Sequence, residues 1–235
     1  MNPKIDLSNL PKHIAFIMDG NGRWARKRGL PRNLGHKAGS EALERLLEEA
    51  AKLGISYFTV YAFSTENRDR PASEVEYLMG LMGEYIDKNI ARVKQNNYRI
   101  RIIGNTDMLD AELLAKIREL EDLTRDKSGL CFNIALYYGG RDEIVRAVKA
   151  IMASGKEADE VTEELVSSYL DTSYMPDPDL IIRTSGEIRM SNFLTWQGAY
   201  SEMYFCDKHW PDFGIDDLVV AIADYQGRNR RFGKV

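Results

Sequence analysis

Short apolar segments alternate with longer helical patterns along the whole chain, and this alternation restricts the fold more than any other feature. The predicted strands are His13–Met18, Tyr57–Phe63, Tyr98–Ile103, Leu130–Tyr137, Leu180–Ile182 and Met203–Cys206. The predicted helices are Ser40–Leu53, Ser73–Gln95, Asp110–Leu123, Asp142–Met152, Glu163–Leu170 and Ile215–Tyr225. Such alternation is typical of parallel sheets. We therefore expect an α/β fold in one domain, residues 1–235, with an open, mostly parallel six-stranded sheet covered by helices on both faces.

Local signals mark several of these boundaries. Asp19-Gly20-Asn21-Gly22 predicts a tight turn directly after the first strand. Gly54 is placed as a helix C-cap. Ser73-Glu74-Val75-Glu76 is a capping-box pattern, which predicts that the long helix begins there.

Composition excludes several classes of protein. The balance of 32 Lys+Arg against 36 Asp+Glu gives a net charge of −4, which argues against nucleic acid as a partner. The two cysteines, Cys131 and Cys206, form no disulfide framework or zinc pattern. No apolar run approaches the ~18 residues of a membrane span, and the N-terminus lacks the apolar core of a signal peptide. We expect a reduced, cytoplasmic enzyme.

Polar residues gather where the predicted strands end. Ligands of open parallel sheets bind beyond the carboxyl ends of the strands. The first strand is followed by Asp19 to Arg23 and then Arg26, Arg28, Arg32 and His36; later strands are followed by 64–70, 139–141 and 183–191. Arginine, serine, threonine and glycine are concentrated in these segments. Arginine forks and free backbone N–H groups bind phosphate oxygens, so the sequence predicts a basic site for more than one phosphate in an acidic protein.

Each of these features also has a simpler interpretation. The glycines near residue 20 are common in ordinary turns, and the arginines from Arg23 to Arg32 are typical of a solvated basic face. Gly20-Asn21-Gly22-Arg23-Trp24-Ala25 also matches G-x-G-x-x-A, which would indicate a dinucleotide-dependent oxidoreductase. Asp19 argues against that alternative because it would repel a bare pyrophosphate, whereas Mg²⁺ beside a diphosphate favours a carboxylate. All these features fall on one predicted rim, which favours one site over several coincidences.

Several motifs spread along the chain together resemble those of one known family. The segment from His13 to Ala25 resembles the signature of cis-prenyltransferases, whose bacterial type is undecaprenyl diphosphate synthase. The similarity continues, in the family's order, through 35–39, 61–67, Arg70-Pro71, 138–141, 183–193, 210–213 and 230–233. The trans-type D-D-x-x-D motif is absent from the sequence.

The resemblance implies sequential cis-condensation of isopentenyl diphosphate onto an allylic diphosphate, usually farnesyl diphosphate. The expected product is undecaprenyl diphosphate, the lipid carrier precursor for cell-wall glycan synthesis. By this resemblance, the small Ala62 lies in the family's tunnel region and leaves room for a long product. The segment from Glu74 to Gly104 has no insertion relative to the bacterial enzymes. Both features favour a product of undecaprenyl length.

The resemblance also implies roles for individual residues. Asp19 and Asn67 would be catalytic, Asp19 through Mg²⁺ and departure of the allylic diphosphate and Asn67 in proton removal. Asp19 and Glu202 would be the metal ligands. The allylic diphosphate would be held by Gly20, Asn21, Gly22, Arg23, Arg32 and His36, and the isopentenyl diphosphate by Arg183, Arg189 and Ser191. A mobile segment between the two sites would contain Ser64, Asn67, Arg70 and Glu74. The wider substrate site would include Trp24, Thr65, Glu66, Arg68 and Met190.

Further expectations concern partners. The resemblance implies a homodimer, in which Arg231-Phe232-Gly233 reaches a neighbouring active site, and it leaves room for a transient contact with a membrane surface during product release. An inactive partner subunit is the competing hypothesis, because the family includes such members. One departure is Arg68, which stands where many members have Trp, and we expect it to alter substrate affinity or loop closure.

Overall fold

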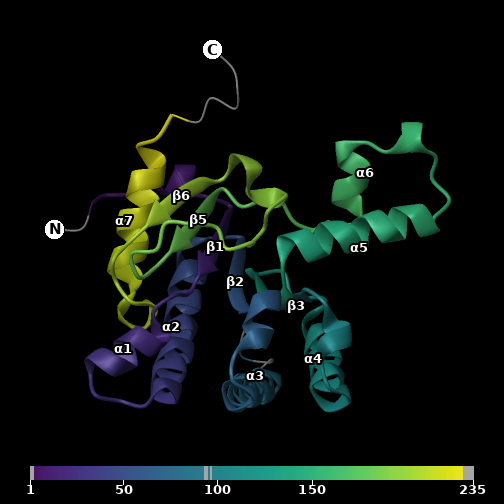
Figure 1. The fold of residues 1–235 in the computed structure, drawn as a ribbon. Coiled ribbons are helices and arrows are strands. Elements are labelled where there is room, and N and C mark those ends of the chain that lie inside the picture. The colour runs from purple at the N-terminus through teal and green to yellow at the C-terminus, as the bar shows by residue number, and fades with distance from the viewer. Residues whose placement is uncertain (1–2, 93–94, 96, 230–235) are drawn as a thin grey trace.

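Six parallel strands form one sheet in the order β3-β4-β2-β1-β5-β6 (Figure 1). The computed structural model describes residues 3–92, 95 and 97–229. The strands are β1 (His13–Ile17), β2 (Tyr57–Ser64), β3 (Arg99–Ile103), β4 (Cys131–Tyr138), β5 (Leu180–Arg183) and β6 (Glu202–Phe205). All six predicted strands are present, and the predicted α/β fold with an open parallel sheet is confirmed.

The helices of the described residues connect these strands. They are α1 (Asn21–Lys27), α2 (Arg32–Leu53), α3 (Ala72–Arg92), α4 (Ala111–Thr124), α5 (Gly140–Ala153), α6 (Glu163–Ser168) and α7 (Ile215–Gln226). A 3-10 turn, η2 (Thr65–Asp69), follows β2. Gly54 ends α2 in the left-handed conformation, with φ of 92°, so the predicted C-cap is confirmed. No helix in the described part of the chain is long and apolar enough to cross a membrane.

The two faces of the sheet are covered unequally. Helices α2, α3, α4 and α7 bury their leucines and isoleucines against one face, in the larger core. Aromatic rings extend this core at the β1 end, where the Phe16 and Phe58 rings stack at 4.7 Å between centroids and Trp210 meets Phe16 edge-on. The other face packs against the segment between β5 and β6, whose Phe193 and Leu194 are fully buried. Helix α5 lies on this second side (Figure 1).

Three boundary predictions are wrong, each for a physical reason. The segment after β1 is not a simple turn, because α1 begins at Asn21, directly after Gly20. Helix α2 begins at Arg32, eight residues before the predicted start, since its first two turns pack on α1 rather than on the sheet. Ser73 is not an N-cap: α3 begins at Ala72, and the Pro71 carbonyl accepts from the Glu74 and Val75 amides. Residues 93 and 94, within the predicted end of this helix, lie outside the described residues.

The strand order determines where a ligand can bind. Strands β1 and β5 are neighbours in the sheet, but the chain continues from them in opposite directions. After β1 it goes to β2, on the side of β1 away from β5. After β5 it goes to β6, at the edge of the sheet. The loops that follow β1 and β5 therefore run apart, and such a switch point leaves a crevice at the carboxyl ends of the strands. The register pairs Ile17 with Arg183, so the residues that follow both strands lie at the same level.

A buried histidine lies at the opposite end of β1. The His13 Nδ1–H donates to the Pro176 carbonyl (2.7 Å), which leaves Nε2 to accept from the Thr59 hydroxyl (2.7 Å). Asn133 Nδ2 in turn donates to Thr59 Oγ1 (3.1 Å). The ring is fully buried, and burial lowers the pKa of His13 to about 4. His13 is therefore neutral in the folded protein at neutral pH.

This histidine makes folding sensitive to acid. Its pKa is lower in the folded chain than its ordinary value of 6.5, so the stabilisation is present above pH 6.5 and is lost as the pH falls towards 4. Between pH 7 and 5 we expect His13 to reduce the free energy of unfolding by about 2 kcal/mol. Urea titration at both pH values measures this loss. In the His13→Gln variant the loss should be smaller by that amount; an equal loss in both proteins would contradict the prediction.

Candidate active site

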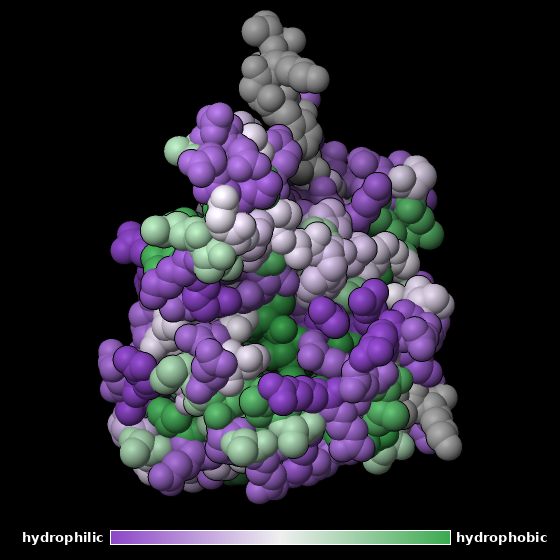
Figure 2. All heavy atoms as spheres, turned by 90° about the vertical axis from the view of Figure 1, so that its right-hand side faces the viewer, coloured by the Kyte–Doolittle hydropathy of each residue, from purple (hydrophilic) through white to green (hydrophobic). Residues whose placement is uncertain are grey.

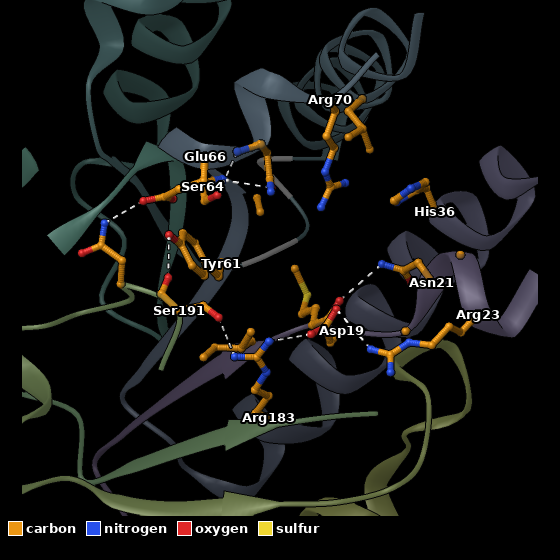
Figure 3. A pocket seen from close by; sticks show the side chains of 18 of the residues that line it. Asp19, Asn21, Arg23, His36, Tyr61, Ser64, Glu66, Arg70, Arg183 and Ser191 are labelled. Atoms are coloured by element: carbon orange, nitrogen blue, oxygen red, sulfur yellow. Dashed lines mark hydrogen bonds and ion pairs between the residues drawn. The ribbon is translucent and has the colours of Figure 1, made fainter. Parts of the chain in front are cut away.

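A cavity of about 710 Å³ lies at the carboxyl ends of β1, β2 and β5 (Figure 3). Its walls carry seven arginines but only two acidic side chains, Asp19 and Glu66. The arginines are Arg23, Arg26, Arg32, Arg70, Arg141, Arg183 and Arg189. This basic cavity in a chain of net charge −4 is the local charge contrast that the sequence predicts. Guanidinium groups at this density suit a ligand with several phosphate oxygens.

An ion pair between Asp19 and Arg183 lies at the centre of this cavity. Arg183 Nη2 donates to Asp19 Oδ2 at 2.7 Å, and Arg183 Nη1 donates to Ser191 Oγ at 2.7 Å and to the Arg189 carbonyl. The Arg183 side chain is 3% exposed, whereas the Asp19 side chain is 34% exposed. Arg183 is thus held in the protein while the carboxylate faces the cavity, with Arg23 on its other side at 3.7 Å (Figure 3).

Close backbone packing shapes the segment that follows Asp19. Gly20 has φ of 104°, a left-handed conformation that favours glycine, and a Cβ there would lie 2.7 Å from Ser185 Oγ. Helix α1 then lies against α2, where a Cβ on Gly39 would lie 2.2 Å from Asn21 Oδ1. The chain can therefore reverse directly under the cavity and present Asn21, Gly22 and Arg23 to it.

The segment after β2 forms another wall. Ser64 Oγ accepts from the Asn67 amide (3.1 Å), and Asn67 Oδ1 accepts from the Ser64 amide (3.2 Å). This reciprocal pair caps η2. The Asn67 oxygen thus already accepts one hydrogen bond, and the Nδ2 group carries two N–H donors that can act on a ligand. The geometry favours a hydrogen-bond donor at Asn67 over a proton acceptor.

Glu74 gathers three basic groups at the edge of the cavity. Its Oε1 lies 3.1 Å from Arg32 Nη2, 3.0 Å from Arg70 Nη1 and 3.7 Å from His36 Nε2. Burial lowers the pKa of His36, and Arg32 and Arg70 lower it further, while Glu74 opposes them. The imidazole is neutral at pH 7 and can donate or accept one hydrogen bond in the cavity.

An apolar cavity of about 100 Å³ adjoins the basic one. It lies between α2, α3 and the sheet, and its lining includes Leu43, Leu81, Met82, Tyr85 and Ile134. Five residues line both cavities: Met18, Asn21, His36, Ala62 and Leu78. The two cavities are therefore contiguous, an arrangement that suits a ligand with a charged head and an apolar tail.

Comparison with known proteins agrees with this geometry. The Prenyltransf family model, described as putative undecaprenyl diphosphate synthase, matches residues 17–233. The chain belongs to the cis-prenyltransferase family. The isoprenyl transferase of Clostridium acetobutylicum is 52% identical, over 98% of this chain and 93% of that protein. The isoprenyl transferase of Streptococcus mutans is 51% identical, over 98% and 96%.

Solved structures of cis-prenyltransferases have the same fold. Lavandulyl diphosphate synthase from Lavandula x intermedia, in complex with dimethylallyl diphosphate, superimposes with a TM-score of 0.92 at 33% identity, over 96% of this chain and 99% of that one. A probable undecaprenyl diphosphate synthase from Campylobacter jejuni gives 0.82 at 33% identity, over 96% and 100%. The protein is a cis-prenyltransferase enzyme.

The structure brings most of the residues predicted for this prenyltransferase site together. Those that line the basic cavity are Asp19, Gly20, Asn21, Gly22, Arg23, Arg32, His36, Ser64, Glu66, Asn67, Arg70, Arg183, Arg189 and Ser191. Glu74 lines the adjoining surface with Arg32 and His36. The basic cavity is also lined by Arg26, Tyr61, Leu78, Arg141 and Asn192, for which the sequence predicts no individual role in diphosphate binding. Arg26 and Arg141 lie in the predicted rim segments, whereas nothing in the local pattern distinguishes Tyr61 or Leu78 from core residues.

Other predicted residues lie away from the cavity lining. The Trp24 indole donates to Asp212 (2.7 Å) and Arg28 lies over its ring, so Trp24 packs on the outer side of α1. Thr65, Arg68 and Met190 are not among the residues that line it, and Arg68 is exposed. Their assignment to the substrate site stays a prediction.

Glu202 lies at the other end of the sheet from Asp19. It is the first residue of β6, and the register places it level with Leu180 and Ile14, five residues before Asp19. Its carboxylate binds Arg228 Nη1 at 2.7 Å. Within one chain, Asp19 and Glu202 are therefore not brought together, and the metal role of Glu202 stays a prediction. The tail motif Arg231-Phe232-Gly233 lies outside the described residues.

The contacts of Glu74 with Arg32, His36 and Arg70 predict how the pKa of His36 depends on the Glu74 charge. Since Glu74 raises the pKa of His36, the Glu74→Gln variant should lower that pKa further. An NMR titration of the imidazole C–H signals measures it directly, because the chain contains only three histidines. Glu76→Gln, an exposed change on the same helix, is the matched control and should leave the titration unchanged. An unchanged or higher His36 pKa in Glu74→Gln would contradict the described cluster.

Proposed function

We propose that the enzyme condenses isopentenyl diphosphate onto an allylic diphosphate, farnesyl diphosphate being the expected primer. The observation that carries this proposal is the contiguity of the two cavities: an arginine-lined space suited to diphosphates shares five lining residues with an apolar one suited to a prenyl tail. Each methylene buried there contributes about 0.8 kcal/mol to binding. The related synthase in complex with dimethylallyl diphosphate supports the allylic substrate class.

The cavity offers two groups of diphosphate ligands. One follows β1 and includes Gly20 to Arg23, Arg32 and His36, beside the apolar opening; we assign it to the allylic diphosphate. The other follows β5 and includes Arg183, Arg189 and Ser191; we assign it to isopentenyl diphosphate. Asp19 and Arg70 lie between these groups (Figure 3). Holding both substrates at once makes their reaction effectively intramolecular.

The residues at Asp19 fit a magnesium ion. Mg²⁺ binds through one or two carboxylates plus substrate phosphate oxygens and water, rather than in an all-protein cage. Asp19 supplies one carboxylate that faces the cavity, and the described residues contain no cluster of three or more His, Cys, Asp or Glu side chains suited to a metal. When bound, Mg²⁺ would neutralise negative charge on the diphosphates. We propose Asp19 as the ligand that this chain contributes at the cavity.

The arginines act on the charge that the reaction develops. In the condensation the allylic C–O bond breaks, and the double bond of isopentenyl diphosphate supplies the electrons for the new C–C bond. Diphosphate departs when the C–O bond breaks; after the C–C bond has formed, the carbon next to the resulting cation loses a proton, which the released diphosphate can accept, and the new double bond forms. Fixed guanidinium groups stabilise the departing diphosphate without reorganising. The Nδ2 group of Asn67, whose oxygen already accepts from the Ser64 amide, can donate to a diphosphate oxygen between the two subsites, so we propose a positioning role for it.

We further propose a product of undecaprenyl length, which would be the lipid carrier precursor for cell-wall glycan synthesis. Ala62 lines both cavities, and its small side chain takes up little space where a growing prenyl chain would lie. Release of such a product would involve a transient contact with a membrane surface. The cytoplasmic location stays a prediction from the sequence.

The direct test combines both substrates. Purified protein with farnesyl diphosphate, labelled isopentenyl diphosphate and Mg²⁺ should give a polyprenyl ladder that stops at a defined length, and EDTA should abolish it. Asp19→Ala should reduce the rate by at least ~100-fold, the scale for loss of one charge-stabilising group. Asp107→Asn, an exposed carboxylate outside the cavity, is the control and should leave the ladder unchanged. No ladder from the folded protein would instead favour an inactive partner subunit.

We also propose that the enzyme is a homodimer. Val145, Val148 and Met152 form one stripe along α5 and are 51%, 45% and 74% exposed. Ile188 and Tyr200, between β5 and β6, are also exposed, at 77% and 69%. Figure 2, which views the α5 and α6 side, shows apolar surface between hydrophilic regions. A second copy packed on this stripe would remove these side chains from water.

Sedimentation equilibrium tests the dimer. We expect twice the chain mass of 26.8 kDa for the wild type and a shift towards monomer for Val148→Glu, because a charge would be buried in the interface. Val220→Glu, a comparably exposed valine on α7, should remain dimeric. A monomeric wild type, or a dimeric Val148→Glu protein, would contradict the proposed surface.

A further inference from the structure

Asn192 connects three separate segments around the basic cavity. It follows Ser191 in the loop after β5, and its Nδ2 donates to Glu66 Oε1 in η2 at 2.9 Å. Its Oδ1 accepts from the Arg141 amide at 2.9 Å, and its carbonyl accepts from the Gly140 amide at 2.7 Å, both at the start of α5. One residue therefore joins the loops after β5, β2 and β4.

The contacts with α5 replace a missing cap. The N-cap position of α5 is Gly139, which has no side chain to accept from the first helical amides. Asn192 supplies these acceptors from another part of the chain, so the helix start and the loop after β5 are held together. Asn192 itself has φ of 61° and Ser191 has φ of 49°. This left-handed backbone is tolerated best by asparagine among residues with side chains, and it turns the amide towards η2 and α5.

The contact with Glu66 determines the chemistry of the link. Burial raises the pKa of Glu66, whereas its hydrogen bonds lower this pKa, and the hydrogen bond from Asn192 has the largest lowering effect. The hydrogen bonds together outweigh burial, so the pKa lies below its ordinary value and Glu66 is a carboxylate at neutral pH. A carboxylate needs a donor, while the Arg141 amide needs an acceptor. A side-chain amide satisfies both at once, whereas an aspartate in this place would face Glu66 with a like charge.

We propose that Asn192 is a positioning residue that fixes the isopentenyl diphosphate subsite relative to Asn67. On one side it adjoins Ser191, which accepts from Arg183; on the other it holds Glu66, the neighbour of Asn67. This inference rests on the proposed function. It makes the loop after β5 and the segment after β2 one unit, so that loosening the link weakens use of isopentenyl diphosphate and leaves binding of the allylic diphosphate unchanged.

A double-mutant cycle tests the link. In Asn192→Asp the side chain still accepts from the Arg141 amide but repels Glu66. We expect kcat/KM for isopentenyl diphosphate to fall about tenfold or more, while KM for the allylic diphosphate stays the same within about twofold. In the Glu66→Gln background the glutamine amide can donate to the carboxylate introduced at position 192. In that background, adding Asn192→Asp should lower kcat/KM for isopentenyl diphosphate by less than about twofold.

The control and the second readout separate positioning from loss of fold. Asn105→Asp changes an asparagine that caps a 3-10 turn outside the cavity, and it should leave both kinetic constants unchanged. Amide hydrogen exchange of residues 64–70 should quicken in Asn192→Asp and return to the Glu66→Gln rate in the double variant. The proposal would be overturned if Asn192→Asp lowered kcat/KM for isopentenyl diphosphate equally in the wild-type and Glu66→Gln proteins, or lowered it in neither. If the wild type makes no polyprenyl product, the proposed function fails, and the exchange rates still decide whether the link exists.

Discussion

The ion pair between Asp19 and Arg183 is the interaction on which the rest of the site depends. Arg183 is almost completely buried, and a buried charge requires a partner and further hydrogen bonds. Asp19, Ser191 and the Arg189 carbonyl supply them, so Arg183 links Asp19 after β1 to the loop after β5. The parallel register that pairs Ile17 with Arg183 makes this possible, because it places the next residues of both strands at one level. The same arrangement leaves the Asp19 carboxylate facing the space where two diphosphates would meet.

A polar half and an apolar half share the cavity walls, and this division follows from the fold. The basic half is built from loops at the carboxyl ends of the strands, where side chains are free to be polar. The apolar half lies between α2, α3 and the sheet, where the side chains that face inward from both helices form part of the hydrophobic core. Met18, Ala62 and Leu78 stand at the boundary, so an amphiphilic substrate can lie across it.

Much of this was predictable from the sequence, and the misses share one cause. The strands are continuous apolar runs, which is the pattern of strands buried on both faces, and the rule that ligands bind at strand ends then located Asp19, Asn67 and Arg183. Helix α1 was missed because it has little apolar periodicity: it forms by packing on α2 where Gly35 and Gly39 allow close approach. The separation of Glu202 from Asp19 depends on strand register, which motif spacing does not contain. The contacts by which Asn192 joins three loops also could not be predicted from the sequence, because they connect residues far apart along the chain.

By itself, the sequence determined the number and order of the strands along the chain, the class of fold, the basic rim and the family, because these depend on local periodicity and on motifs read in order. Only the tertiary structure decided which rim residues face one another, that the Asn67 oxygen accepts from the Ser64 amide, that Ala62 lines both cavities, and that Asn192 caps a helix that begins far earlier in the chain. Those properties arise from contacts between segments far apart in the sequence. Their distances follow from the order of the strands in the sheet and from their register, which no single stretch of sequence encodes.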